Sequence, residues 1–144
     1  MQSIYFVVYG KPQGKARPRL TRDGHAYTPK STRMYERHIL ETFRRETLGA
    51  YDVAPAFPAG TPVRLTVRVY HAMPISASRI RKQEMLDGTT PCARKPDLDN
   101  VLKVVADALN GWAYEDDTQI TYIRASRAWS TDARLEIELA DDSR

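Results

Sequence analysis

The sequence contains a single cysteine, Cys92, and no long uncharged hydrophobic run. One cysteine excludes an intrachain disulfide and a zinc site built from a cluster of cysteines. The longest apolar run, residues 4–9, has the length of a strand and is too short to cross a membrane. It also lacks the basic flank that precedes the apolar core of a signal peptide. We therefore expect a cytoplasmic protein that does not interact with a membrane.

Two other kinds of site are also missing. The sequence has no Gly-x-x-x-x-Gly-Lys loop, so neither a nucleotide cofactor nor a nucleotide-driven motor is expected. The histidines His25, His38 and His71 show no metal-ligand spacing with one another or with Cys92. Each is interpreted as a surface or packing residue.

The composition is that of a soluble globular protein, and its charge is unevenly distributed. With 144 residues, 42% of them hydrophobic and 28% charged, the chain is expected to form one domain over residues 1–144. Residues 1–45 carry 10 basic and 3 acidic side chains, whereas residues 91–144 carry 7 and 11. The basic first third predicts a polyanionic partner, because Lys and Arg neutralise phosphates. The acidic last third requires a separate explanation.

Hydrophobic periodicity predicts a small α+β protein with helices packed on a mixed sheet. The continuous apolar run at residues 4–9 predicts a strand covered on both faces. Residues 10–30, rich in proline and glycine, are predicted to form a loop. The expected order is β-α-β-α-α-β-β. Strands are expected at residues 4–9, 63–70, 119–129 and 134–139. Helices are expected at residues 32–48 (ended by Gly49), after Ser78 (a short one) and at residues 98–110 (capped by Asp97).

The helix predicted at residues 98–110 carries the most informative polar pattern. Asp99, Lys103 and Asp107 lie four residues apart and therefore share one helical face. A second acidic group, at residues 115–117, follows in the turn after this helix. If that turn folds back against the helix start, three or four carboxylates converge, and such oxygen ligands suit Mg²⁺. A basic surface beside a carboxylate cluster is what metal-assisted phosphodiester cleavage requires.

The same residues also allow a purely structural interpretation. Asp is a common helix N-cap, and an Asp–Lys pair four residues apart is ordinary surface electrostatics. Acidic residues also often occupy turns. Charge and spacing alone therefore leave both the nuclease and the structural interpretation open.

Two motifs resemble the signature of the RusA family of Holliday junction resolvases. The first is Lys95-Pro96-Asp97-Leu98-Asp99-Asn100-x-x-Lys103, followed by Asp107-Ala108-Leu109-Asn110-Gly111 and Asp116-Asp117-Thr118-Gln119-Ile120. The second lies upstream and reads Gly10-Lys11-Pro12-x-x-Lys15-x-Arg17-Pro18-Arg19, then Tyr27-Thr28-Pro29. The matched segments run from the first predicted strand to about Ile120, so the resemblance extends over most of the chain, and two motifs in the family's order make it specific.

The resemblance implies a homodimeric, Mg²⁺-dependent endonuclease of α+β fold, in which Mn²⁺ is expected to substitute. Such an enzyme acts in DNA recombination and repair and nicks paired strands of a four-way DNA junction symmetrically. The resemblance assigns catalysis to Asp97, Asp99, Lys103 and Asp117. It assigns metal binding to Asp97, Asp99 and Asp117, with Asp116 as an accessory ligand. It assigns DNA binding to Lys11, Lys15, Arg17 and Arg19.

Two alternatives remain at this stage. The chain could be a junction- or DNA-binding module without cleavage, which would need only the basic surface. It could also be a metal nuclease that acts on other branched nucleic acids, such as flaps, or on RNA. The role of Asp107 is left unassigned.

Overall fold

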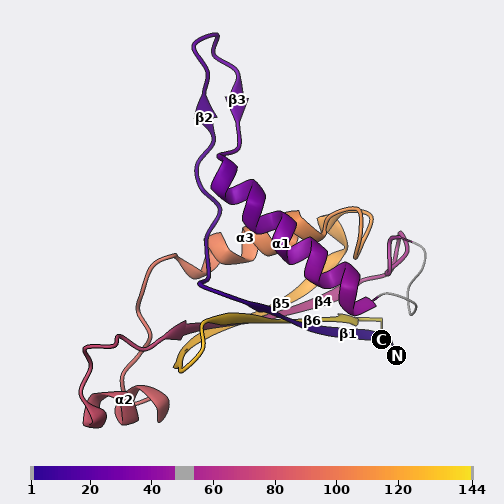
Figure 1. The fold of residues 1–144 in the computed structure, drawn as a ribbon. Helices are drawn as coiled ribbons and strands as arrows, with labels where there is room; N and C mark the ends of the chain where they lie inside the picture. The colour runs from indigo at the N-terminus through magenta and orange to yellow at the C-terminus, as the bar shows by residue number, and fades with distance from the viewer. Residues whose placement is uncertain (1, 48–53, 144) are drawn as a thin grey trace.

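A four-stranded sheet with two long helices on one of its faces forms the body of the protein in the computed structural model (Figure 1). The structure describes residues 2–47 and 54–143. Its elements in chain order are β1 (Ser3–Tyr9), β2 (Arg19–Leu20), β3 (Ala26–Tyr27), α1 (Lys30–Thr47), β4 (Val63–Ala72), α2 (Arg79–Leu86), α3 (Leu98–Leu109), the 3₁₀ helix η1 (Asp117–Gln119), β5 (Ile120–Ser130) and β6 (Arg134–Asp141). The predicted end of the first helix at Leu48 and Gly49 lies outside the described residues.

The sheet is mixed, as predicted, with the strand order β1-β6-β4-β5. β6 pairs antiparallel with both β1 and β4, whereas β4 and β5 run parallel. Because parallel neighbours cannot be joined by a tight turn, the chain leaves the sheet after β4 and returns through α2, α3 and η1. This crossover connection contains the predicted acidic motif. The motif therefore lies beside β5 and the helix layer.

The core lies between the sheet and the two helices α1 and α3. β4 and β6 alternate as their sequences predict, with one row of side chains buried and the other facing away. The buried set is dominated by aliphatic and aromatic residues such as Phe6, Ile39, Leu65, Val105 and Ile137. No helix among the described residues is long and apolar enough to span a membrane.

The prediction that residues 4–9 are covered on both faces is wrong. Ile4, Phe6 and Val8 are buried, but Tyr5 and Tyr9 are 54% and 66% exposed. α1 and α3 cover only one face of the sheet, so the outer row of β1 faces solvent (Figure 1). Tyrosine satisfies both surroundings, because its ring packs along the strand while its hydroxyl reaches water.

The predicted loop at residues 10–30 contains a projecting β-hairpin instead. β2 and β3 pair antiparallel and extend away from the body, above the start of α1 in Figure 1. The turn is closed by hydrogen bonds from the Thr21 N–H to the His25 carbonyl (2.9 Å) and from the Gly24 N–H to the Thr21 carbonyl (3.0 Å). Gly24 adopts φ +81°, which glycine tolerates best. We call residues 17–27 the hairpin arm.

Candidate active site

The start of α3 presents Asp97 to solvent. Asp97 occupies the N-cap position that its sequence predicts, with an extended backbone, but its side chain makes no capping hydrogen bond. Its carboxylate is therefore not engaged by the first amides of the helix, as the purely structural interpretation would require.

The exposed face of α3 carries the polar residues predicted to share it. Asp99, Lys103 and Asp107 are all exposed, whereas Val101, Val105 and the rest of the opposite stripe are buried. Lys103 follows Asp99 by about one helical turn. The helix thus holds two carboxylates and a lysine on a rigid element beside Asp97.

Arg127 of β5 fixes the segment that leads into α3. Its Nη1 donates hydrogen bonds to the carbonyl oxygens of Pro96 (2.9 Å) and Arg94. Arg127 lies on the helix side of the sheet, because its register partner Val69 is one of the buried residues of β4. Sequence reasoning missed this residue. The available signal was an arginine in an inward position of an alternating strand, which is costly unless it is paired.

The loop after β1 closes over the same segment from the other side. A Cβ on Gly14 would lie 2.9 Å from the Cβ atoms of both Pro96 and Asn100, so only glycine fits without a shift. The next residue, Lys15, donates its backbone N–H to the Asn100 carbonyl at 3.0 Å. The loop that carries the upstream motif is thereby attached to the start of α3, where the downstream motif begins.

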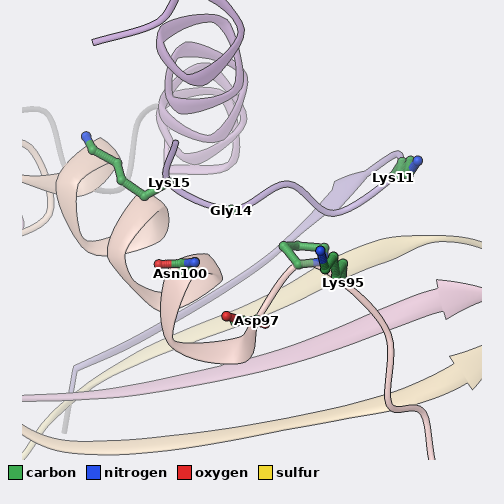
Figure 2. Close-up of a pocket in the computed structure, with 7 residues that line it drawn as sticks. Lys11, Gly14, Lys15, Lys95, Asp97 and Asn100 are labelled. Carbon is green, nitrogen blue, oxygen red and sulfur yellow. The ribbon is translucent and has the colours of Figure 1, made fainter. Parts of the chain in front are cut away.

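Between this loop and α3 lies an open hollow with basic and acidic side chains (Figure 2). Its lining residues are Lys11, Gly14, Lys15, Lys95, Pro96, Asp97 and Asn100. Lys11 and Lys95 come from separate segments and flank the same hollow as the carboxylate of Asp97. The hollow therefore combines cations that can hold a phosphate with an oxygen ligand for a hard cation.

Lys15 does not direct its ammonium group toward Asp97, although its backbone lines the hollow. Figure 2 shows the side chain extending away from Asp97, and its Nζ lies 2.6 Å from Glu36 Oε1 and 3.0 Å from Asp107 Oδ2. Burial lowers the pKa of Lys15, but the hydrogen bonds to both carboxylates outweigh it, and the net shift is upward. Lys15 therefore links α1 to α3 with its charge compensated.

The other predicted DNA-binding residues lie in two different places. Lys11 is exposed at the hollow, whereas Arg17 and Arg19 are exposed at the base of the hairpin arm. The upstream motif thus supplies one cation to the hollow, one ion-paired link to the helices and two cations to the arm.

Asp116 and Asp117 lie at the opposite end of α3 from Asp97. α3 has 12 residues, which at 1.5 Å per residue separates its ends by roughly 18 Å. Asp117 begins η1, and its charge and that of Asp107 raise the pKa of Tyr114, after the larger effect of burial. The Tyr114 hydroxyl donates a hydrogen bond to the Ala106 carbonyl at 2.6 Å. Tyr114, and with it the acidic turn, therefore lies beside the last turns of α3.

Asp116 has its own local partner. Its Oδ2 accepts a hydrogen bond from the Thr118 hydroxyl at 2.6 Å, and this bond lowers the pKa of Asp116. The side-chain Oε1 of Gln119 in turn accepts from the backbone N–H of Asp116 at 3.2 Å. Asp116 is thus ionised and held by the turn itself.

The predicted convergence of the two acidic groups does not occur within one chain. Across residues 2–47 and 54–143, no three side chains of His, Cys, Asp or Glu lie close enough together to hold a metal ion. The turn after α3 leads directly into β5 and does not fold back against Asp97 and Asp99. The intervening helix is rigid, so its length keeps the two groups apart.

His71 is buried beside the segment that Arg127 holds. It is 3% exposed on β4, and its Nε2 has no hydrogen-bond partner among the described residues. Burial lowers the pKa of His71, and the positive charges of Arg127, Arg94 and Lys11 lower it further. A neutral packing histidine agrees with its interpretation from sequence.

Comparisons with known proteins identify the family. The family described as Endodeoxyribonuclease RusA matches residues 9–140. The chain belongs to the RusA family. A protein of Bacillus subtilis (strain 168), named "Uncharacterized protein YqaN", is 32% identical over 148 residues, which cover 99% of each chain.

The RusA match includes every part of the site described above, from Lys11 in the hollow to Asp117 after α3. It also agrees with the α+β fold and the mixed sheet. Membership in this family indicates endodeoxyribonuclease activity, that is, hydrolysis of phosphodiester bonds within DNA. The basic hollow beside Asp97 is chemically suited to that substrate.

Proposed function

We propose that this RusA family protein is a Mg²⁺-dependent endonuclease that resolves four-way DNA junctions by paired symmetric nicks, in DNA recombination and repair. The observation that carries the proposal is the carboxylate of Asp97, free of any capping bond, in a hollow flanked by Lys11 and Lys95. A carboxylate that only caps a helix does not require neighbouring cations. A phosphodiester substrate does require them, because its negative charge must be compensated where it meets a carboxylate.

Asp97 and Asp99 fit a divalent cation, since both are exposed oxygen ligands at a rigid helix start. A bound Mg²⁺ supplies a Lewis acid toward the phosphate and lowers the pKa of a bound water, and Mn²⁺ should do the same. Lys103 holds a positive charge on the same face, where it can stabilise negative charge that develops on the phosphate. Lys11 and Lys95 position the DNA backbone.

We propose that Asp116 and Asp117 act at the site of a second copy of the chain. Within one chain, the length of α3, roughly 18 Å, separates them from Asp97. In a homodimer, the acidic turn of one protomer can face the start of α3 of the other. Two-fold symmetry then creates two equal sites, which suits two symmetric nicks in a junction that is itself two-fold symmetric.

Cleavage of a synthetic four-way junction in Mg²⁺ tests the proposal. We expect paired nicks by the native protein and a loss of at least about a hundredfold in Asp99→Asn, with junction binding retained or tighter because a negative charge near phosphate is removed. Asp132→Asn is the matched control, since Asp132 is exposed in the turn between β5 and β6. Undiminished cleavage by Asp99→Asn would refute the assignment of this site.

The same experiment separates the alternatives. Binding of the junction in Mg²⁺ without nicking, under conditions where a known resolvase cuts, would identify a binding module. Faster cleavage of flaps or RNA than of the four-way junction would identify a metal nuclease with a different substrate.

A further inference from the structure

The hairpin arm has no core of its own, yet it carries exposed apolar side chains. All residues from Arg17 to Tyr27 are exposed, and within them Leu20 and Tyr27 are 69% and 45% exposed. Burial against the body therefore does not explain their presence. Because the arm projects from the body (Figure 1), these side chains can reach a partner that the body does not contact.

The arm is basic and its shape is fixed. Arg17, Arg19 and Arg22 outnumber Asp23, and no ion pair involves them among the residues that the structure describes. The Thr21 hydroxyl accepts a hydrogen bond from the His25 N–H at 3.1 Å, which adds to the backbone bonds of the turn. The arm can therefore approach a polyanion as a preformed element.

The strand register places Arg19 beside Tyr27. Arg19 pairs with Tyr27, and Leu20 with Ala26, so Arg19 and Tyr27 share one face of the arm while Leu20 lies on the other. A continuous duplex presents phosphates and groove edges, which suit the arginines but offer little to the apolar side chains. The branch point of a junction also exposes the faces of base pairs, against which an aromatic ring or an aliphatic wedge can pack.

We propose that the hairpin arm recognises the branch point of DNA, with Leu20 and Tyr27 packing on exposed base faces and the arginines holding the adjacent phosphates. This inference rests on the proposed function, because it names the part of the substrate that distinguishes a junction from a duplex. It makes the arm a determinant of specificity, separate from the carboxylates that cleave.

The test compares the native protein with the double variant Leu20→Ala/Tyr27→Ala, in chelator so that no cleavage occurs. Affinity for a four-way junction should fall about tenfold, because base–aromatic stacking contributes that order of binding. Affinity for a continuous duplex of the same sequence should change less than twofold. The fluorescence of 2-aminopurine at the branch point should fall on binding the native protein, because stacking on an aromatic ring quenches it, and should not fall with the double variant.

Two control variants calibrate the result. Ile80→Ala removes a 72% exposed apolar side chain from α2 and should alter neither affinity. Arg19→Ala should weaken junction and duplex binding together and reduce the salt dependence of both. Neither Leu20 nor Tyr27 supports the core, so an unchanged unfolding midpoint is expected for the double variant.

Three outcomes would overturn the inference. The first is an equal loss of junction and duplex affinity in the double variant, and the second is no loss of either. The third is a changed oligomeric state in light scattering with junction selectivity intact, which would make the arm a contact between copies of the chain. If the native protein neither binds nor cuts junctions, the proposed function fails; if it does both while the double variant keeps its selectivity, only this inference fails.

Discussion

At the scale of single residues, the position of Asp97 depends on two contacts to the segment that directly precedes it. Arg127 bonds the carbonyls of Arg94 and Pro96, and Gly14 closes against Pro96 from the opposite side. Pro96 directly precedes Asp97, so a shift at either contact would move the carboxylate. We therefore infer that both residues position Asp97.

Arg127→Met should raise the Mg²⁺ concentration needed for half-maximal cleavage by about tenfold, the usual cost of losing a group that orients a metal ligand. Junction affinity in chelator should change little, and added guanidinium should restore part of the rate. The matched control is Arg124→Met, which removes an exposed arginine from the other face of β5. An unchanged Mg²⁺ requirement, or one raised equally by both variants, would show that Arg127 has no positioning role.

At the scale of elements, Lys15 joins α1 to α3 through Glu36 and Asp107. Lys15→Met should lower the free energy of unfolding at pH 7 by about 1 kcal/mol, as expected for a partly exposed ion pair. The folded state raises the pKa of Lys15 above its ordinary 10.5. The stabilisation is therefore fully present below pH 10.5 and is lost as the pH rises through the folded pKa.

Denaturant titrations from pH 7 to 11 measure this effect. The difference between the native protein and Lys15→Met should be constant to about pH 10 and then shrink. Lys30→Met, at the exposed start of α1, serves as the control because Lys30 forms no ion pair among the described residues. A difference that grows with pH would contradict the ion-pair explanation.

The elements also show how much could be predicted from sequence. α3 was predictable because an apolar stripe, an Asp N-cap and a following glycine all indicate the same helix. The coverage of β1 was not, since a continuous apolar run does not reveal that tyrosines face solvent. The hairpin arm escaped prediction because its two-residue strands are too short to show periodicity.

The exposed face of α3 in the candidate site could be predicted from sequence, but the geometry of the site could not. Motif spacing along α3 correctly places Asp99 and Lys103 on one exposed face. It does not show on which side of the helix the later turn lies, and Asp117 proves to be at the far end. An inward-facing arginine in a strand indicates that Arg127 needs a partner, but the local sequence does not show that the partners are carbonyls of the distant chain before α3.

At the scale of the whole molecule, the separated acidic groups predict complementation between copies. A mixture of Asp97→Asn and Asp117→Asn protomers should nick junctions, although each variant alone is inactive. A mixed dimer would contain one site with both substitutions and one site with neither, so each junction should receive a single nick. The measurement is cleavage by the two variants alone and after mixing, with product mapping on both strands.

The control for this experiment is a mixture of Asp97→Asn with Asp99→Asn. Both residues lie at the same end of α3 and would enter the same site from one protomer, so this mixture should remain inactive. No recovery in the first mixture, with mixed dimers demonstrated, would place the complete site within one chain.

The lone cysteine has a practical consequence for observing the arm. Cys92 is 7% exposed, and burial raises the pKa of its thiol, so little reactive thiolate is present near neutral pH. A maleimide dye should therefore label a thiol introduced by Asp23→Cys at the exposed tip of the arm and leave Cys92 largely untouched. Energy transfer from that single dye to one at a junction centre would follow the arm's approach in real time.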